Sequence, residues 1–433
     1  MRDIINKLGK FYINDSDIDF KGKIKSNGKI FYLESENLMQ KIKIKSCDLI
    51  FGEIGGTFIT LYKCHLYNKT YKLIFIIEYI FKDFKNENLT FNVVDVKFNN
   101  LEEWMEIPVV EQKTDEKITI NFPSKLKSYE LNKFTLRLFC NKKIHGSLNR
   151  YEITNDFKIR LEYPKKITFD ELLNDINLIK NFLSLCMYNQ TEIQKLTLIS
   201  EDKTGNEQEI NVYSKFFKQT NIPLNFHSIL LHYSELEEEF VKIFNRWFEI
   251  YDIFENTIYL YFMTISYKTN AETLFLTYTQ SLEAFIRKNN NFNKFYMDKS
   301  DYENIKQEFG EFLDKLNLND SSHEQSLKNR IKYGNEYSFR KRLNVLINYL
   351  NEYEVINNLN DEYNGNFVKT IVDTRNYYTH YGDEFTFTKS GRDLLFLAYD
   401  LKLIIELCIL HELKLPKELI NKKLSNKLYN YRR

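Results

Sequence analysis

The chain has 433 residues, of which 43% are apolar and 15% aromatic, which excludes a disordered protein and predicts two or three folded domains. A formal net charge of +1 gives no overall attraction to polyanions, so nucleic-acid binding would need a local basic patch. The five cysteines form no C-x-x-C pair, which indicates a reducing compartment. The N-terminus has no signal-peptide core, and no apolar run is long enough to cross a bilayer. We therefore expect a cytoplasmic chain without a membrane partner.

The first 165 residues alternate in the manner of β-strands. Short segments rich in β-branched and aromatic residues are separated by Gly, Asn and Asp, which predicts a mostly antiparallel sandwich or barrel. The expected strands lie at 41–52, 57–66, 71–81, 91–98, 117–122, 134–140 and 157–163. We read the segment 101–104 as a turn at the sheet edge.

A helix and a strand extend this region. Residues 168–188 have Thr168 as a plausible N-cap and a row of leucines and isoleucines on one face, which predicts a helix. A strand is expected at 195–200. We therefore place a β-rich N-terminal domain at residues 1–230, with strands in 1–165 and a helix-strand extension in 166–230.

Helical periodicity dominates from residue 231 to residue 433. Ser234 opens a Ser-x-x-Glu capping box ahead of 234–254, and further helices are expected at 271–288, 338–350, 367–382 and 391–410. The Asn- and Lys-rich spans 287–300 and 317–336 are expected to be long loops. The fold class is thus α+β, with a β-rich domain followed by an all-α bundle of four or five helices.

Three polar residues lie on or beside the apolar face of the helix expected at 367–382. On a helical wheel Arg375 falls inside the apolar arc, while Asn376 and His380 lie four apart at its edge. A buried guanidinium is costly unless it meets a carboxylate or a phosphate. Arg375 therefore either has an acidic partner within the bundle or faces a groove that binds an anion.

The motif Arg-Asn-x-x-x-His on the penultimate long helix resembles the Arg-x4-His motif of HEPN ribonucleases. Segments 51–65 and 91–108 are similar to the β-rich N-terminal domain of ApeA-type anti-phage proteins. Segments 274–288, 338–347 and 375–382 are similar, in the same order, to their HEPN domain. The resemblance spans most of the chain.

This resemblance implies metal-independent RNA cleavage, in which the ribose 2′-OH attacks the adjacent phosphate and leaves a 2′,3′-cyclic phosphate. His380 suits the proton transfer, because its side chain titrates near neutrality. Arg375 suits the charge that develops on the phosphoryl oxygens, and Asn376 could orient the imidazole or bind the phosphate. No Gly-rich phosphate loop, H-E-x-x-H motif or nucleophile elbow is present, so we expect no metal and no cofactor.

The resemblance also implies partners. It predicts a homodimer or higher oligomer through the HEPN domain, with paired motifs in one cleft, and an N-terminal domain that senses infection through an unknown phage-derived activator. The expected substrate is cellular RNA with a single-stranded loop, such as a tRNA anticodon loop, and its cleavage would abort infection.

Other residues carry two interpretations each. Glu283 either pairs with Arg375 and serves the catalytic site or forms a surface pair with Arg287. Arg340, Lys341 and Arg342 either bind the RNA backbone or form a solvated helix end. The tyrosines at 377, 378 and 381 either stack on bases or pack the helix.

The rival hypothesis is a non-catalytic HEPN-like module. It would dimerise and bind RNA or protein, while its N-terminal domain recruits a partner. The intact set of Arg375, Asn376 and His380 argues against this hypothesis, because a domain that only binds has no need of all three.

Overall fold

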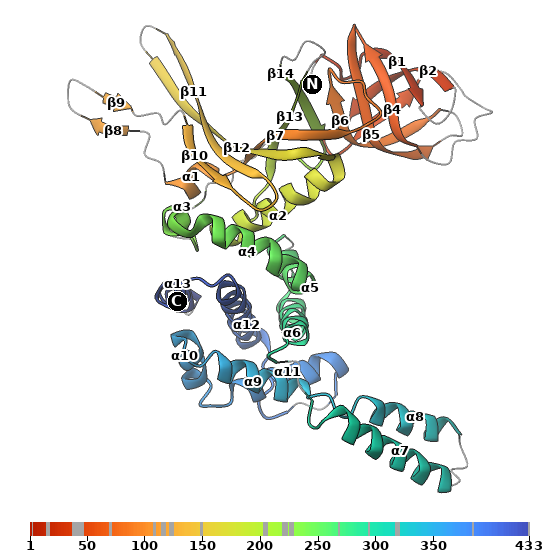
Figure 1. The fold of residues 1–433 in the computed structure, drawn as a ribbon, viewed down its shortest axis with the longest axis vertical. Coiled ribbons are helices and arrows are strands. Elements are labelled where there is room, and N and C mark those ends of the chain that lie inside the picture. The colour runs from red at the N-terminus through yellow and green to blue at the C-terminus, as the bar shows by residue number, and fades with distance from the viewer. Residues whose placement is uncertain are drawn as a thin grey trace. The chain divides into compact units, whose positions relative to one another are not determined.

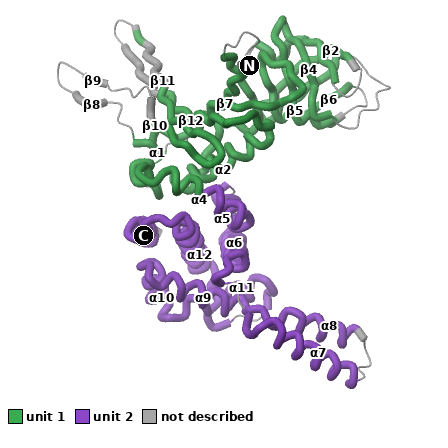
Figure 2. Tube along the Cα trace, in the orientation of Figure 1, with its two compact units in different colours: residues 1–245 green, residues 246–433 purple. Residues whose placement is uncertain are grey.

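The computed structural model describes residues 1, 3–13, 18–36, 47–68, 72–106, 110–113, 118–120, 125–147, 150–201, 207–218, 224, 229–266, 269–292, 295–316, 321–382 and 385–431. They form two compact units, Met1–Asn245 and Arg246–Arg433 (Figure 2). The N-terminal unit is built on β-sheet and the C-terminal unit is helical, which confirms the α+β fold class. The domain limit expected at residue 230 stays a prediction.

A closed barrel occupies the first part of the N-terminal unit (Figure 1). Its strands pair antiparallel in the order β6-β3-β2-β1-β4-β5, and β5 pairs in turn with β6. Closure leaves no exposed sheet edge among these strands. The strands are β1 (Leu8–Ile13), β2 (Ile18–Ser26), β3 (Phe31–Ser35), β4 (Cys47–Ile54), β5 (Thr57–Asn68) and β6 (Ile74–Lys82).

Alternating burial along the strands explains the barrel core. In β1, Gly9, Phe11 and Ile13 are buried while Lys10 is exposed, as expected for a strand with one face inward. Phe11 pairs with Gly52 of β4, and an ideal Cβ at that glycine would lie 2.4 Å from Cδ1 of the Phe11 ring. The ring therefore occupies the space that a side chain at position 52 would need.

An open antiparallel sheet continues from the barrel in the order β14-β13-β7-β12-β11-β10. The two parts share β6, because its first half pairs with β3 while Tyr79–Phe81 pairs with β14. The further strands are β7 (Thr90–Phe98), β10 (Lys125–Glu130), β11 (Thr135–Ser147), β12 (Arg150–Thr168), β13 (Ile193–Glu201) and β14 (Glu207–Ser214), beside a separate pair β8 (Val110–Lys113) and β9 (Ile118–Ile120). The parts of the predicted strands at 41–46, 71, 117 and 121–122 lie outside the described residues.

Helix α2 (Phe169–Met187) confirms the helix predicted at 168–188. Thr168 and Glu171 form a reciprocal capping box at its start. The Phe169 ring packs edge-on against Phe81 and Tyr79, with centroid distances of 4.8 and 5.2 Å. These contacts fasten the helix to strand β6.

Two local predictions in this unit are wrong. Residues 101–104 form a short helix, α1 (Leu101–Met105), rather than a turn, because Trp104 is buried and donates from Nε1 to the Leu231 carbonyl at 2.9 Å. Helix α3 (Tyr233–Leu236) begins before Ser234, with His232 as its N-cap residue. The Ser234 hydroxyl instead donates to Glu106 at 2.5 Å.

The helical unit contains more helices than expected. Beyond α4 (Phe240–Ile253), which crosses the unit boundary, the helices are α5 (Glu255–Ser266), α6 (Ala271–Lys288), α7 (Lys299–Lys315), α8 (Ser321–Lys332), α9 (Phe339–Tyr349), α10 (Glu354–Glu362), α11 (Phe367–His380), α12 (Gly391–Glu412) and α13 (Lys417–Tyr431). The loop expected at 317–336 is wrong, because α8 is a polar helix supported by a Glu324–Lys328 pair at i,i+4. Residues 317–320 lie outside the description.

Helix α12 forms the centre of this unit. Its residues from Leu401 to Leu410 are almost all buried, and it packs along α6. Inside the core, the Tyr261 hydroxyl donates to the buried Glu406 carboxylate at 2.8 Å. Helix α11 packs against α6 and α9, so the Arg375 motif lies beside two other helices of the same unit (Figure 1). None of the described helices combines the length and the hydropathy that a bilayer span requires.

Candidate active site on helix α11

Helix α11 ends directly after His380. Tyr381 adopts a left-handed conformation with φ of 48°, and its amide donates to the Tyr377 carbonyl at 2.6 Å. The Ile371 and Tyr378 side chains hold the other face of the helix in the bundle. The end of the helix therefore presents His380 to solvent, while the Tyr381 ring is 73% exposed.

Arg375 lies at the edge of the buried face. Its side chain is 34% exposed, so the guanidinium predicted inside the apolar arc is only half-buried and needs no fully buried counter-ion. Its contacts are long: Nη1 donates to Oδ1 of Asn376 at 3.4 Å, and Cζ lies 6.0 Å from the centre of the Phe339 ring. A guanidinium held this loosely keeps donors available for an incoming anion.

His380 stands one helical turn beyond Asn376. Its imidazole is exposed, and it has no hydrogen bond or ion pair with the rest of the described chain. An exposed imidazole at this position is accessible to a bound substrate, and histidine is the side chain that most often serves as general acid or base. The structure thus brings Arg375 and Asn376 into contact and places His380 at the open end of the same helix.

Glu283 of helix α6 fits both interpretations. Its Oε1 lies 3.2 Å from Nη2 of Arg287, which is the expected surface pair, and its Oε2 lies 3.9 Å from Nη2 of Arg375. The pair with Arg287 is the tighter of the two. A role for Glu283 in the chemistry stays a prediction.

The three basic residues predicted to form a patch on α9 differ in their exposure. Arg340 and Lys341 are exposed, and Arg340 pairs with Asp373 of α11 at 3.1 Å. Arg342 is 1% exposed and donates to Glu336 at 3.0 Å, so an RNA-binding role for Arg342 is wrong for this conformation. The sequence contained a signal, because Arg342 lies four positions before the buried Leu346 and so on the inward face of its helix.

Sequence reasoning missed the role of Glu336. This carboxylate contacts both Arg342 at 3.0 Å and Arg287 at 3.1 Å. Hydrogen bonding from Arg342, and to a smaller degree from Arg287, lowers its pKa below the ordinary glutamate value. No periodic pattern marks Glu336, because it stands in the irregular segment before α9.

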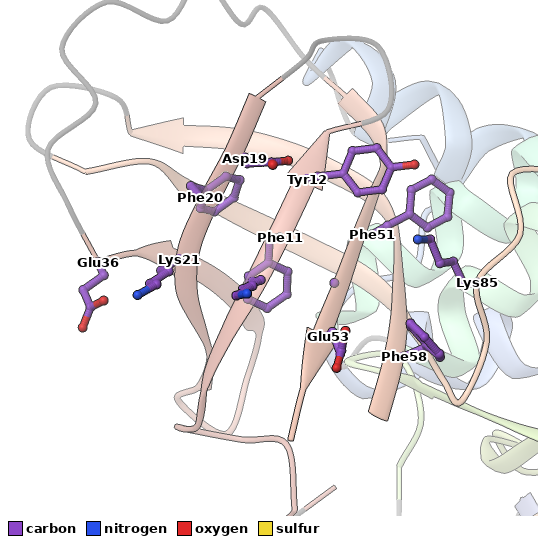
Figure 3. A pocket seen from close by; sticks show the side chains of 12 residues that line it. Phe11, Tyr12, Asp19, Phe20, Lys21, Glu36, Phe51, Glu53, Phe58 and Lys85 are labelled. Carbon is purple, nitrogen blue, oxygen red and sulfur yellow. The ribbon is translucent and has the colours of Figure 1, made fainter. Parts of the chain in front are cut away.

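A cavity of about 630 Å³ lies on the N-terminal unit (Figure 3). Aromatic rings, among them Tyr12, Phe51 and Phe58, share its wall with charged residues of both signs. The formal charges cancel, because three lysines, at 10, 21 and 85, and three acids, at 19, 36 and 53, line the cavity. The cavity therefore offers a polyanion no net attraction.

Both units match family models. Residues 6–247, more than half of the chain, match the ApeA N-terminal domain 1, and residues 276–419 match the Apea-like HEPN domain. Neither curated proteins nor solved structures gave a significant match. The HEPN match includes α11 with Arg375, Asn376 and His380. The chain therefore belongs to the ApeA family, with an ApeA N-terminal domain followed by an Apea-like HEPN domain.

Proposed function

We propose that this chain is a metal-independent HEPN endoribonuclease of bacterial anti-phage defence. The observation that carries the proposal is the end of α11, where a loosely held Arg375 contacts Asn376 and an exposed His380 follows one turn later. HEPN domains are usually nuclease-like, and their combination with an ApeA N-terminal domain points to an RNase-type defence role.

The proposed reaction uses the RNA's own 2′-OH as nucleophile. His380 takes the proton from the hydroxyl, the 2′ oxygen bonds to phosphorus, and the bond from phosphorus to the 5′ oxygen breaks. Arg375 stabilises the charge on the non-bridging oxygens, and Asn376 hydrogen-bonds the phosphate or the imidazole. The products are a 2′,3′-cyclic phosphate and a 5′-OH, after the leaving oxygen gains a proton. DNA lacks the nucleophile and is not a substrate.

A site made by two copies of the chain suits the spacing of the motif. Five positions along an ideal helix correspond to a rotation of about 140°, so Arg375 and His380 leave α11 in different directions. A second α11 placed alongside would supply the missing partner for each. We therefore propose a homodimer whose paired motifs share one cleft.

The proposed substrate is a single-stranded loop of cellular RNA, with tRNA anticodon loops as the first candidates. Arg340 and Lys341, exposed at the start of α9, are the proposed contacts to the RNA backbone. The N-terminal unit would hold the nuclease inactive until a phage-derived activator binds it. Cleavage would then stop translation in the infected cell.

The test is an end-mapping assay with purified protein, total tRNA and EDTA, with and without lysate from infected cells. We expect wild-type cuts with 2′,3′-cyclic phosphates and a loss of at least about 100-fold in His380→Ala, the usual cost of removing a general base. His65→Ala is the matched control, because His65 is an exposed histidine on the barrel. Substrate with 2′-deoxy sugars should resist cleavage.

Two outcomes would overturn the proposal. Equal cutting by wild type and His380→Ala would remove the histidine from the mechanism. Tight tRNA binding without cutting, even in infected-cell lysate, would instead support the non-catalytic binding module.

A further inference from the structure

The Glu283 carboxylate lies between two arginines of the helical unit. Oε1 accepts from Nε of Arg287 at 3.2 Å and lies 3.2 Å from its Nη2, while Oε2 stands 3.9 Å from Nη2 of Arg375. A normal hydrogen bond to a charged donor is about 2.7–2.9 Å long. A shift of roughly 1 Å in the Glu283 side chain would therefore exchange its partner.

Arg287 is itself anchored. Its Nη1 lies 3.1 Å from Oε2 of Glu336, and the same oxygen accepts from Nη2 of Arg342 at 3.0 Å. Arg342 is 1% exposed, and its Nε has no hydrogen-bond partner among the described residues. A buried arginine thus fixes Glu336, Glu336 fixes Arg287, and Arg287 holds Glu283.

These contacts form a relay of five side chains, and its positive charges outnumber its negative charges by one. Arg342, Arg287 and Arg375 contribute three positive charges, and Glu336 and Glu283 contribute two negative ones. The relay satisfies the two carboxylates with its first two arginines, and the unmatched guanidinium is that of Arg375. A phosphate monoanion bound there would complete the charge balance.

Without Arg287, the Glu283 carboxylate would lose its nearer cation. Its side chain is 24% exposed, so water would solvate the carboxylate only in part, and pairing with another cation would be favoured. Arg375 is the cation within reach. The pair formed would occupy the guanidinium edge that an RNA phosphate needs.

We propose that Arg287, fixed by Glu336 and the buried Arg342, keeps the Glu283 carboxylate off Arg375 so that Arg375 stays available to a phosphate. This inference rests on the proposed ribonuclease function and assigns Arg287 as a positioning residue. Saturating substrate displaces Glu283 from Arg375, so loss of Arg287 raises KM and leaves kcat unchanged.

The kinetic test compares Arg287→Ala, Glu283→Gln and the double variant on an RNA substrate. We expect KM to rise about tenfold in Arg287→Ala with kcat within about twofold of wild type, since a phosphate contact of this kind is worth a factor of about ten. Adding Glu283→Gln should restore KM, which a merely structural role of Arg287 would not allow. Lys328→Ala and its double variant with Glu324→Gln are the matched control, because they remove an equivalent i,i+4 pair on α8. An unchanged KM, or a raised KM that Glu283→Gln does not restore, would overturn the inference.

A second readout needs no RNA. Glu283→Gln and Arg375→Gln are combined in a double-mutant cycle of urea midpoints, once with Arg287 present and once in Arg287→Ala. The coupling between the two substitutions should be small with Arg287 present, where Oε2 of Glu283 lies 3.9 Å from Nη2 of Arg375, and larger in Arg287→Ala. A coupling that is no larger in Arg287→Ala overturns the inference even for an active nuclease, whereas a larger coupling in a chain that cuts no RNA upholds the pairing and removes the ribonuclease proposal.

Discussion

The Arg340 guanidinium of helix α9 lies 3.1 Å from the Asp373 carboxylate, two residues before Arg375 on helix α11. The arginine is 47% exposed and the aspartate 9%, so the pair ties an exposed helix start to the buried side of the motif helix. Arg340→Ala should lower the free energy of unfolding by about 0.2–1 kcal/mol, the usual range for a partly exposed pair. Urea unfolding measures this loss. Unchanged stability would show that the pair with Asp373 does not support the bundle, and the same variant should weaken RNA binding if Arg340 also contacts the RNA backbone as proposed.

Lys341 is exposed beside Arg340 and has no carboxylate partner among the described residues. If it binds an RNA phosphate, Lys341→Ala should reduce the slope of log affinity against log salt by about 0.7, the value for one contact to a single strand. Binding titrations at several salt concentrations measure the slope. Lys315→Ala, at the exposed end of α7, is the control and should leave the slope unchanged.

Glu336 makes the stability of the helical unit depend on pH. Its folded pKa is lowered by hydrogen bonding from Arg342 and by Arg287, so its stabilising effect is complete above the unfolded pKa of about 4.3 and is lost as the pH falls through the folded pKa. The difference in unfolding free energy between wild type and Glu336→Gln should be constant from about pH 5.5 to 7.5 and shrink below about pH 4. Denaturation at a series of pH values checks this. A difference that grows on acidification would contradict the assigned contacts.

The Tyr261 hydroxyl donates to Oε1 of Glu406, a side chain that is 0% exposed and whose Oε2 has no hydrogen-bond partner among the described residues. Tyr261→Phe removes the donor and should cost about 1–3 kcal/mol of unfolding free energy, because the carboxylate loses a partner inside the core. Tyr259→Phe is a matched control, since Tyr259 is 62% exposed on the same helix. Equal stability of the two variants would argue against this contact.

Glycine 52 and Phe11 provide a test of the barrel. In Gly52→Ala the added methyl group would lie 2.4 Å from the Phe11 ring, which is 2% exposed and closely surrounded, so a loss of about 1–3 kcal/mol is expected from overpacking. The same substitution at Gly310, inside α7 with nothing within 4 Å of the new methyl, should stabilise by about 0.5–1 kcal/mol. Opposite signs in thermal denaturation would confirm the packing of β1 against β4.

Local patterns predicted much of this fold, and long-range packing decided the rest. Thr168 and Glu171 predict the start of α2, because a capping box depends only on two residues three positions apart in the sequence. The choice between sandwich and barrel required the pairing of β5 with β6 together with that of β1 with β4, which no local pattern specifies.

The site shows the same division. The motif on α11 was predicted because helical periodicity and residue chemistry are both local. The partners of Arg375 and Arg287 come from α6 and from the irregular segment at Glu336, which only the folded bundle brings together. Arg342 was misassigned because three consecutive basic residues on a helix point in three directions, of which one faced inward.

Strand β6 belongs both to the barrel and to the open sheet, because Ile74–Ile77 pairs with β3 and Tyr79–Phe81 pairs with β14. A register slip of β6 in the barrel would turn its buried residues outward in the open sheet as well. We therefore expect the barrel and the open sheet to open as one cooperative element, whose amide protons exchange together. A ligand that deforms the barrel wall would transmit that strain along a single continuous backbone to the strand on which helix α2 rests.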